Sequence, residues 1–175
     1  MFVCPIVHRY FRMRSFPSVS ILAASLIATT VLMGCGGAST TSSGGAGPVL
    51  PAVNTAAATQ LLSPDEALQT VSFPAVGSTS LAGRVEGYKT VSYAVPVAAG
   101  QILTVELKSD SSNAYFNIHD AADSSGAAVF NGNSGARVAR LTGTQDVTYV
   151  IRPFQQRATA RRGEAFDYTF LVDRR

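Results

Sequence analysis

The sequence predicts an all-β fold, namely an antiparallel β-sandwich or jelly roll that forms a single domain behind an export segment. Three observations support this fold class. Apolar and polar residues alternate along most of the chain from residue 70 onward, which is typical of strands with one buried face. Gly, Pro, Asn and Asp interrupt these stretches about every 8 to 12 residues, and no window has convincing helical periodicity.

Residues 1–34 have the composition of a bacterial signal peptide. Their first half carries Arg9, Arg12 and Arg14 and no acid, and residues 19–33 are uncharged and mostly apolar. This apolar run is shorter than the roughly 20 residues that a membrane-spanning helix needs. A basic start, a short apolar run and a small residue before the cleavage point together predict secretion.

The end of this segment, Leu32-Met33-Gly34-Cys35, resembles the lipobox of bacterial lipoproteins. Cys35 is therefore predicted to be the lipidated first residue of the mature protein. Gly36 stands where an Asp would favour retention at the inner membrane, so we expect an anchor on the periplasmic side of the outer membrane. The alternatives are an ordinary signal with an incidental cysteine and, for the start of translation, Met13.

Cysteine and charge restrict the classes of function. The two cysteines are Cys4 and Cys35, so the domain is expected to contain no disulfide. Three of the 14 basic residues lie in the predicted signal, which leaves 11 basic and 11 acidic residues. The basic isoelectric point therefore comes from the signal and does not indicate a nucleic-acid partner. From residue 137 onward there are eight basic and four acidic residues, which predicts a basic face.

Residues 35–60 are rich in Gly, Ser, Thr and Ala and carry no charge, which is typical of a flexible tether. Residues 61–175 are expected to form the domain. One helical turn is possible at residues 63–67, where Ser63 could cap and Pro64 could begin a helix. The predicted strands cover 70–73, 80–86, 90–97, 101–108, 115–119, 128–130, 137–141, 147–152 and 166–172.

No constellation of residues favours catalysis, metal binding or a cofactor. His119 is the single histidine after residue 34, and we expect it to be structural. A zinc site needs three or four His, Cys or carboxylate ligands, and the spacing of Asp120, Asp123 and Gly126 departs from a calcium loop. No feature selects two carboxylates for glycoside hydrolysis, and no phosphate-binding glycine loop is present. The sequence therefore favours binding over enzymatic activity.

Residues 153–163 form a long excursion between two well-formed predicted strands, where a two-residue turn would suffice. Long ordered loops of this kind often carry function. Arginine offers a planar cationic fork and tyrosine offers rigid contact area, and both are frequent at protein interfaces. The alternative is a solvated loop whose arginines pair with Glu164 or Asp167. The candidate binding residues are Arg157, Arg161 and Arg162 of the excursion, with Tyr88 and Tyr115 elsewhere.

Three groups of motifs carry a resemblance to one protein family. The first is Leu107-Lys108-Ser109-Asp110 followed by Asn113-Ala114-Tyr115-Phe116-Asn117, and the second is the arginine-rich stretch 157–164 followed by Tyr168-Thr169. They resemble the central and the closing motif of the periplasmic inhibitors of g-type lysozyme. The resemblance covers residues 71–172. Its front part, residues 81–88, 91–93 and 99–105, is less specific, because the stretch from 99 to 105 also occurs in β-modules appended to secreted peptidases.

The resemblance implies a β-sandwich that blocks the active-site cleft of lysozyme. It places the family's binding tyrosine at Tyr88 and its two binding arginines at Arg157 and Arg161. Residues 153–156 depart from the family pattern beside Arg157, and residues 118–129 also differ, so the class of lysozyme bound is open. The alternative functions are a carbohydrate- or peptidoglycan-binding module and a peptidase-associated β-module without inhibitory activity.

Overall fold

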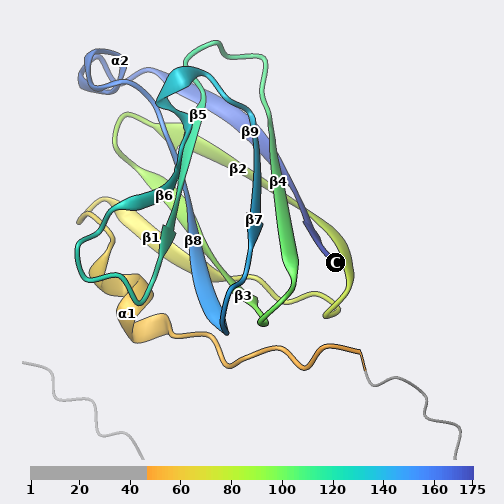
Figure 1. The fold of residues 1–175 in the computed structure, drawn as a ribbon. Helices are drawn as coiled ribbons and strands as arrows, with labels where there is room; N and C mark the ends of the chain where they lie inside the picture. Colours follow the sequence, from red (N-terminus) through yellow and green to blue (C-terminus); the bar gives the residue numbers. More distant parts are fainter. Residues whose placement is uncertain (1–46) are drawn as a thin grey trace, which may run out of the picture. The chain divides into compact units, whose positions relative to one another are not determined.

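A computed structural model describes residues 47–175, and the strands among them form two sheets packed face to face (Figure 1). One sheet has the strand order β1-β3-β8-β5-β6 and the other has the order β2-β9-β4-β7. The elements are α1 (Thr55–Gln60), β1 (Glu66–Thr70), β2 (Gly77–Glu86), β3 (Thr90–Val97), β4 (Ile102–Lys108), β5 (Tyr115–Asp120), β6 (Ala128–Asn131), the 3-10 turn η1 (Gly132–Ser134), β7 (Val138–Thr142), β8 (Val147–Phe154), α2 (Arg157–Arg161) and β9 (Ala165–Arg174).

The predicted all-β sandwich is confirmed. Every strand pair is antiparallel except β1 with β3, which is parallel. The chain reaches this parallel pairing by passing through β2 in the other sheet before it returns as β3. The first strand lies at Glu66–Thr70 rather than at the predicted residues 70–73.

The core lies between the two sheets and follows the alternation seen in the sequence. In β4, Leu103, Val105 and Leu107 are buried, while the residues between them are partly exposed. Phe116, Phe170 and Tyr93 fill the centre with edge-to-face ring contacts. This burial is the main favourable contribution to folding, at about 25 cal/mol per Å² of apolar surface.

The helix α1 contradicts the prediction that residues 35–60 belong to a tether throughout. The Asn54 side chain accepts a hydrogen bond from Ala57 N and caps the helix. Ala58 is fully buried and belongs to a second apolar cluster with Ala94 and Val150, on the outer face of the first sheet. Tertiary contact therefore holds a helix too short to be stable alone.

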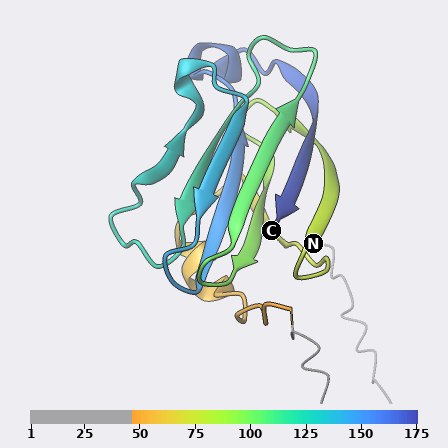
Figure 2. The ribbon, with the colours of Figure 1, turned by 45° about the vertical axis from the view of Figure 1, so that its right-hand side comes forward.

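The predicted helical turn at residues 63–67 is wrong, because Pro64 and Asp65 form a turn and Glu66 already begins β1. The excursion at residues 153–163, expected as a loop, contains the short helix α2. Figures 1 and 2 show α1 at one end of the sandwich and α2 at the other.

Candidate functional site

The candidate site lies where the β2–β3 turn meets the β8–β9 excursion, at the end of the domain marked by α2 in Figure 1. Gly87 and Tyr88 form the turn, and residues 153–163 form the excursion, which Glu164 follows. We call these residues, together with Tyr115, the tip. Gly87 N donates to the Glu164 carbonyl at 2.9 Å, so two segments distant in sequence are joined directly.

Local backbone geometry presents Tyr88 to solvent. Glu86 and Lys89 exchange two backbone hydrogen bonds, which leaves Gly87 and Tyr88 as a two-residue hairpin turn. Gly87 has φ +59°, a conformation that glycine adopts without strain. The Tyr88 side chain that follows is 51% exposed. A large aromatic residue is therefore displayed on a short and constrained turn.

The helix α2 displays two arginines on one face. Thr159 and Ala160 are buried and fix the helix against the domain, whereas Arg157 and Arg161 are exposed. Residues four apart lie on the same side of a helix. The helix ends at Arg161, and Gly163 two residues further on, with a φ of +70°, reverses the chain toward β9.

The three candidate arginines differ in their ion pairing. Arg162 pairs with Glu164 at 2.6 Å, and Asp167 pairs with Arg84 at 3.0 Å. Within residues 47–175, no carboxylate lies within 4 Å of Arg157 or Arg161. The alternative in which the excursion arginines pair with local acids therefore applies to Arg162 alone.

Tyr115 also belongs to the tip. Its ring stacks on Phe154 with centroids 5.7 Å apart, because the two residues are directly opposite in β5 and β8. Its hydroxyl accepts a hydrogen bond from Gln156 Nε2 at 3.3 Å. The structure thus brings together all five residues predicted from the sequence: Tyr88, Tyr115, Arg157, Arg161 and Arg162.

Sequence reasoning missed two residues that shape the tip. Phe154 supplies the ring beneath Tyr115, and Gln155 is buried between the turn and the excursion. A signal was present, because residues 153–156 depart from the family pattern. The partner of each residue, however, depends on strand register and on a turn almost 70 positions away.

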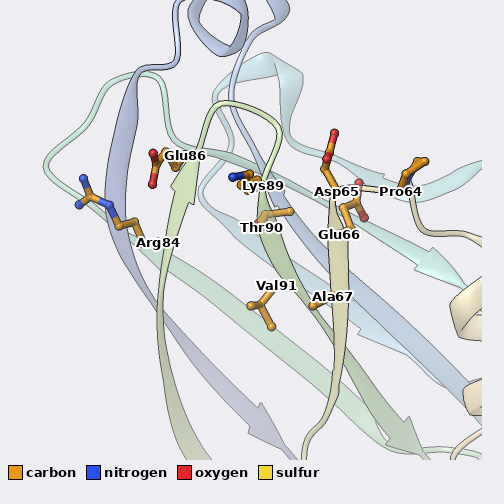
Figure 3. Close-up of a pocket in the computed structure, with 9 residues that line it drawn as sticks. All are labelled: Pro64, Asp65, Glu66, Ala67, Arg84, Glu86, Lys89, Thr90 and Val91. Atoms are coloured by element: carbon orange, nitrogen blue, oxygen red, sulfur yellow. The ribbon is translucent and has the colours of Figure 1, made fainter. Parts of the chain in front are cut away.

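A hollow of about 500 Å³ lies beside the tip, between the start of β1 and the strands β2 and β3 (Figure 3). Two of its charged side chains, Glu66 and Arg84, make ion pairs with neighbours. Glu66 accepts two hydrogen bonds from Arg152, at 2.6 and 3.0 Å, and Arg84 is held by Asp167. The hollow lies along β1 and β2, which are edge strands of their sheets.

Other chemistry is poorly supported in the part of the chain that the structure describes. It contains no group of three His, Cys, Asp or Glu residues that could hold a metal ion. His119 is 6% exposed, and its Nδ1 donates to the Gly126 carbonyl at 3.0 Å. Burial, and then the charge of Arg152, lowers the pKa of His119 below its ordinary value. This histidine is structural, as expected.

The predicted signal peptide and Cys35 lie outside the described residues. Among residues 47–175, the helices are too short to cross a bilayer. Asp120 and Asp123 lie in a turn, where each carboxylate accepts a hydrogen bond from the backbone N–H two residues further on.

The solved structures that resemble this domain include protein inhibitors of lysozyme. The periplasmic inhibitor of g-type lysozyme from Aeromonas hydrophila is 31% identical, with a TM-score of 0.56 over 63% of this chain and 98% of that one. The Salmonella Typhimurium inhibitor is 19% identical, with a TM-score of 0.49 over 62% and 98%. No family model and no curated protein matched the sequence.

The similarity to the Aeromonas hydrophila protein covers almost its full length. The chain belongs to the family of periplasmic inhibitors of g-type lysozyme. This result confirms the resemblance seen in the sequence.

Proposed function

We propose that this protein binds lysozyme, with a preference for the g-type, and inhibits it by inserting the tip into the active-site cleft. One observation carries the proposal: Arg157 and Arg161 are exposed on α2 and have no carboxylate partner among residues 47–175, and the turn that bears the exposed Tyr88 packs against the same helix. Related inhibitors of g-type lysozyme, one of them 31% identical, support the choice of partner.

The proposed mechanism is electrostatic. Glycoside hydrolysis by lysozyme needs a carboxylic acid that donates a proton to the leaving group. A guanidinium paired with that acid would depress its pKa and leave it unable to donate. Arg157 and Arg161 would supply the cations through charge-assisted hydrogen bonds. Tyr88 would pack where a sugar ring normally sits, with Tyr115 and Arg162 at the edge of the contact.

The test is a cell-wall lysis assay in which purified full-length protein is titrated against g-, i- and c-type lysozymes. Stoichiometric inhibition of the g-type enzyme alone is the expected result. Inhibition of another type would retain the mechanism and would direct attention to residues 153–156. Absence of any inhibition, with retention on peptidoglycan sacculi, would favour the alternative of a wall-binding module.

A double substitution, Arg157→Ala with Arg161→Ala, tests the assignment of residues. Each truncation should weaken binding by about 2–4 kcal/mol if the side chain is a hot spot. Thermal unfolding serves as the check that the variant is folded, and Arg140→Ala, at a site on β7, is the matched control. A folded double variant that inhibits as well as the wild type would contradict the assignment.

We further propose that Cys35 carries a lipid that anchors the protein on the periplasmic side of the outer membrane. The support is the lipobox-like sequence and the Gly at position 36. Several acyl chains together anchor a protein stably, at roughly 0.8 kcal/mol per buried CH₂ group. Cys35→Ser should move the protein from the membrane fraction to the soluble periplasmic fraction, and an unchanged distribution would sink the idea.

A further inference from the structure

We infer that Gln155 is a positioning residue that fixes the Tyr88 turn and the arginine-bearing helix α2 in one geometry; this inference rests on the proposed function. Gln155 is 7% exposed and lies between the two segments. Because it is buried, it would act through the groups that it holds and would not contact lysozyme itself.

The hydrogen bonds of Gln155 join the two ends of the excursion to the turn. Its Nε2 donates to the Gly87 carbonyl at 3.0 Å and to the Glu164 carbonyl at 2.7 Å. A primary amide nitrogen carries two hydrogens, so both are used. The same Glu164 carbonyl accepts from Gly87 N at 2.9 Å. One side chain therefore ties together the start of the excursion, its end and the β2–β3 turn.

This arrangement sets the distance between Tyr88 and the arginines of α2, which are the groups proposed to contact lysozyme. Tyr88 directly follows Gly87, and Arg157 lies two residues after Gln155. The turn also packs closely against α2, since a Cβ at Gly87 would lie 3.3 Å from the Ala160 carbonyl oxygen. Without the Gln155 amide, the turn and the helix would lose their common attachment. Binding would then have to order both segments, which lowers affinity.

A second buried glutamine provides a matched control. Gln101 is 3% exposed, its Nε2 donates to the Ala75 carbonyl at 2.7 Å, and its Oε1 accepts from Ala98 N at 2.9 Å. It lies beside the ends of β3 and β9, whereas Gln155 lies beside their starts. Gln101 thus makes comparable bonds at the end of the domain opposite the tip.

The experiment compares Gln155→Met with Gln101→Met in full-length protein. Methionine preserves length but removes both N–H donors, so each variant should unfold at a lower temperature. Gln155→Met should weaken lysozyme inhibition about tenfold, the size expected for two lost hydrogen bonds that order a binding surface. Gln101→Met should inhibit within about twofold of the wild type by the same reasoning. Equal inhibition by both variants would overturn the inference.

A second readout is the coupling between residues. The double variant Gln155→Met with Tyr88→Ala should lose less lysozyme inhibition than the product of the two single-variant losses. The reason is that a Tyr88 whose turn is no longer fixed contributes less to binding. If the fold-loss of inhibition in the double variant equals the product of the two single losses, the residues act independently and Gln155 has no positioning role.

A third measurement does not depend on lysozyme, so it separates failure of this inference from failure of the proposed function. Hydrogen exchange of the Gly87 amide reports its bond to the Glu164 carbonyl. Gln155→Met should accelerate that exchange, and Gln101→Met should leave it unchanged. Unchanged exchange in Gln155→Met would overturn the inference even if the wild type inhibits no lysozyme.

Discussion

Two arginines at the tip, Arg157 and Arg161, have surroundings opposite to those of Arg174 inside the sandwich. Arg174 is fully buried, donates to the carbonyls of Pro96, Phe73 and Pro74, and lies 3.7 Å from the Phe73 ring centroid. Arg157 and Arg161 are exposed and pair with no carboxylate among residues 47–175. The first kind holds the fold together, and the second leaves its hydrogen-bonding capacity available to another molecule.

The difference shows why a count of basic residues was a poor guide to function. Eight basic residues follow position 136 and suggested one basic face. In the structure, Arg174 is bound inside the sandwich, Arg152 is paired with Glu66 and Arg162 is paired with Glu164. Only the partners of each side chain, which the sequence does not show, separate structural arginines from available ones.

The largest effect on stability is expected for Arg174→Ala. It removes three hydrogen bonds, one of them fully buried, and empties the space of a fully buried side chain, so the free energy of unfolding should fall by about 3–5 kcal/mol. Urea denaturation measures this change. Arg175→Ala, next in sequence and mostly exposed, is the control and should change stability by less than about 0.5 kcal/mol. Equal effects would erase the distinction between buried and exposed arginines.

A smaller effect is expected from the titration of His119 near Arg152. The pKa of His119 is lowered in the folded domain, chiefly by burial and then by Arg152. As pH falls through the unfolded value near 6.5, the unfolded chain takes up a proton that the folded domain does not. The free energy of unfolding should therefore be lower at about pH 5 than at about pH 7.5.

The control for this pH dependence is His119→Asn, whose amide can still donate to the Gly126 carbonyl. This variant should lose much of the stability change over that interval. Asp123 and Asp173 do not contribute there, because their pKa values are lowered and they titrate at more acid pH. A pH dependence that persists unchanged in His119→Asn would assign it to other groups.

The smallest effect on stability is expected at the tip. Arg157→Ala with Arg161→Ala should change the free energy of unfolding by less than about 0.5 kcal/mol, because both side chains are exposed and alanine favours helix. Urea denaturation with the same protocol allows direct comparison with Arg174→Ala. A loss above about 1 kcal/mol would mean that these arginines support α2 itself.

The strands could be predicted from the sequence because one face of each is buried against the other sheet. Residues 103, 105 and 107 follow this rule, and so do 166, 168, 170 and 172. Alternation of buried and exposed residues did not predict the elements whose position depends on other contacts. The helix α1 depends on Ala94 and Val150 from distant strands, and β1 begins at Glu66 because that residue pairs with Arg152 and its strand with β3.

The candidate site could be predicted in its residues but not in its construction. Arginine and tyrosine in unusual positions, and the family resemblance, pointed to Tyr88, Arg157 and Arg161. The helical spacing of the two arginines, the pairing of Arg162 and the bridge made by Gln155 all depend on the folded chain. Local sequence patterns do not encode which carbonyl a buried amide will meet.

The attachment of α1 distinguishes the two ends of the domain. Asn54 N donates to the Thr148 hydroxyl near the start of β8, whereas α2 follows the end of the same eight-residue strand. At about 3.3 Å per residue, this strand separates the two points by roughly 25 Å. The described chain therefore enters the sandwich at the end opposite α2. A partner bound at the tip and the segment that leads into α1 would occupy opposite ends of the domain.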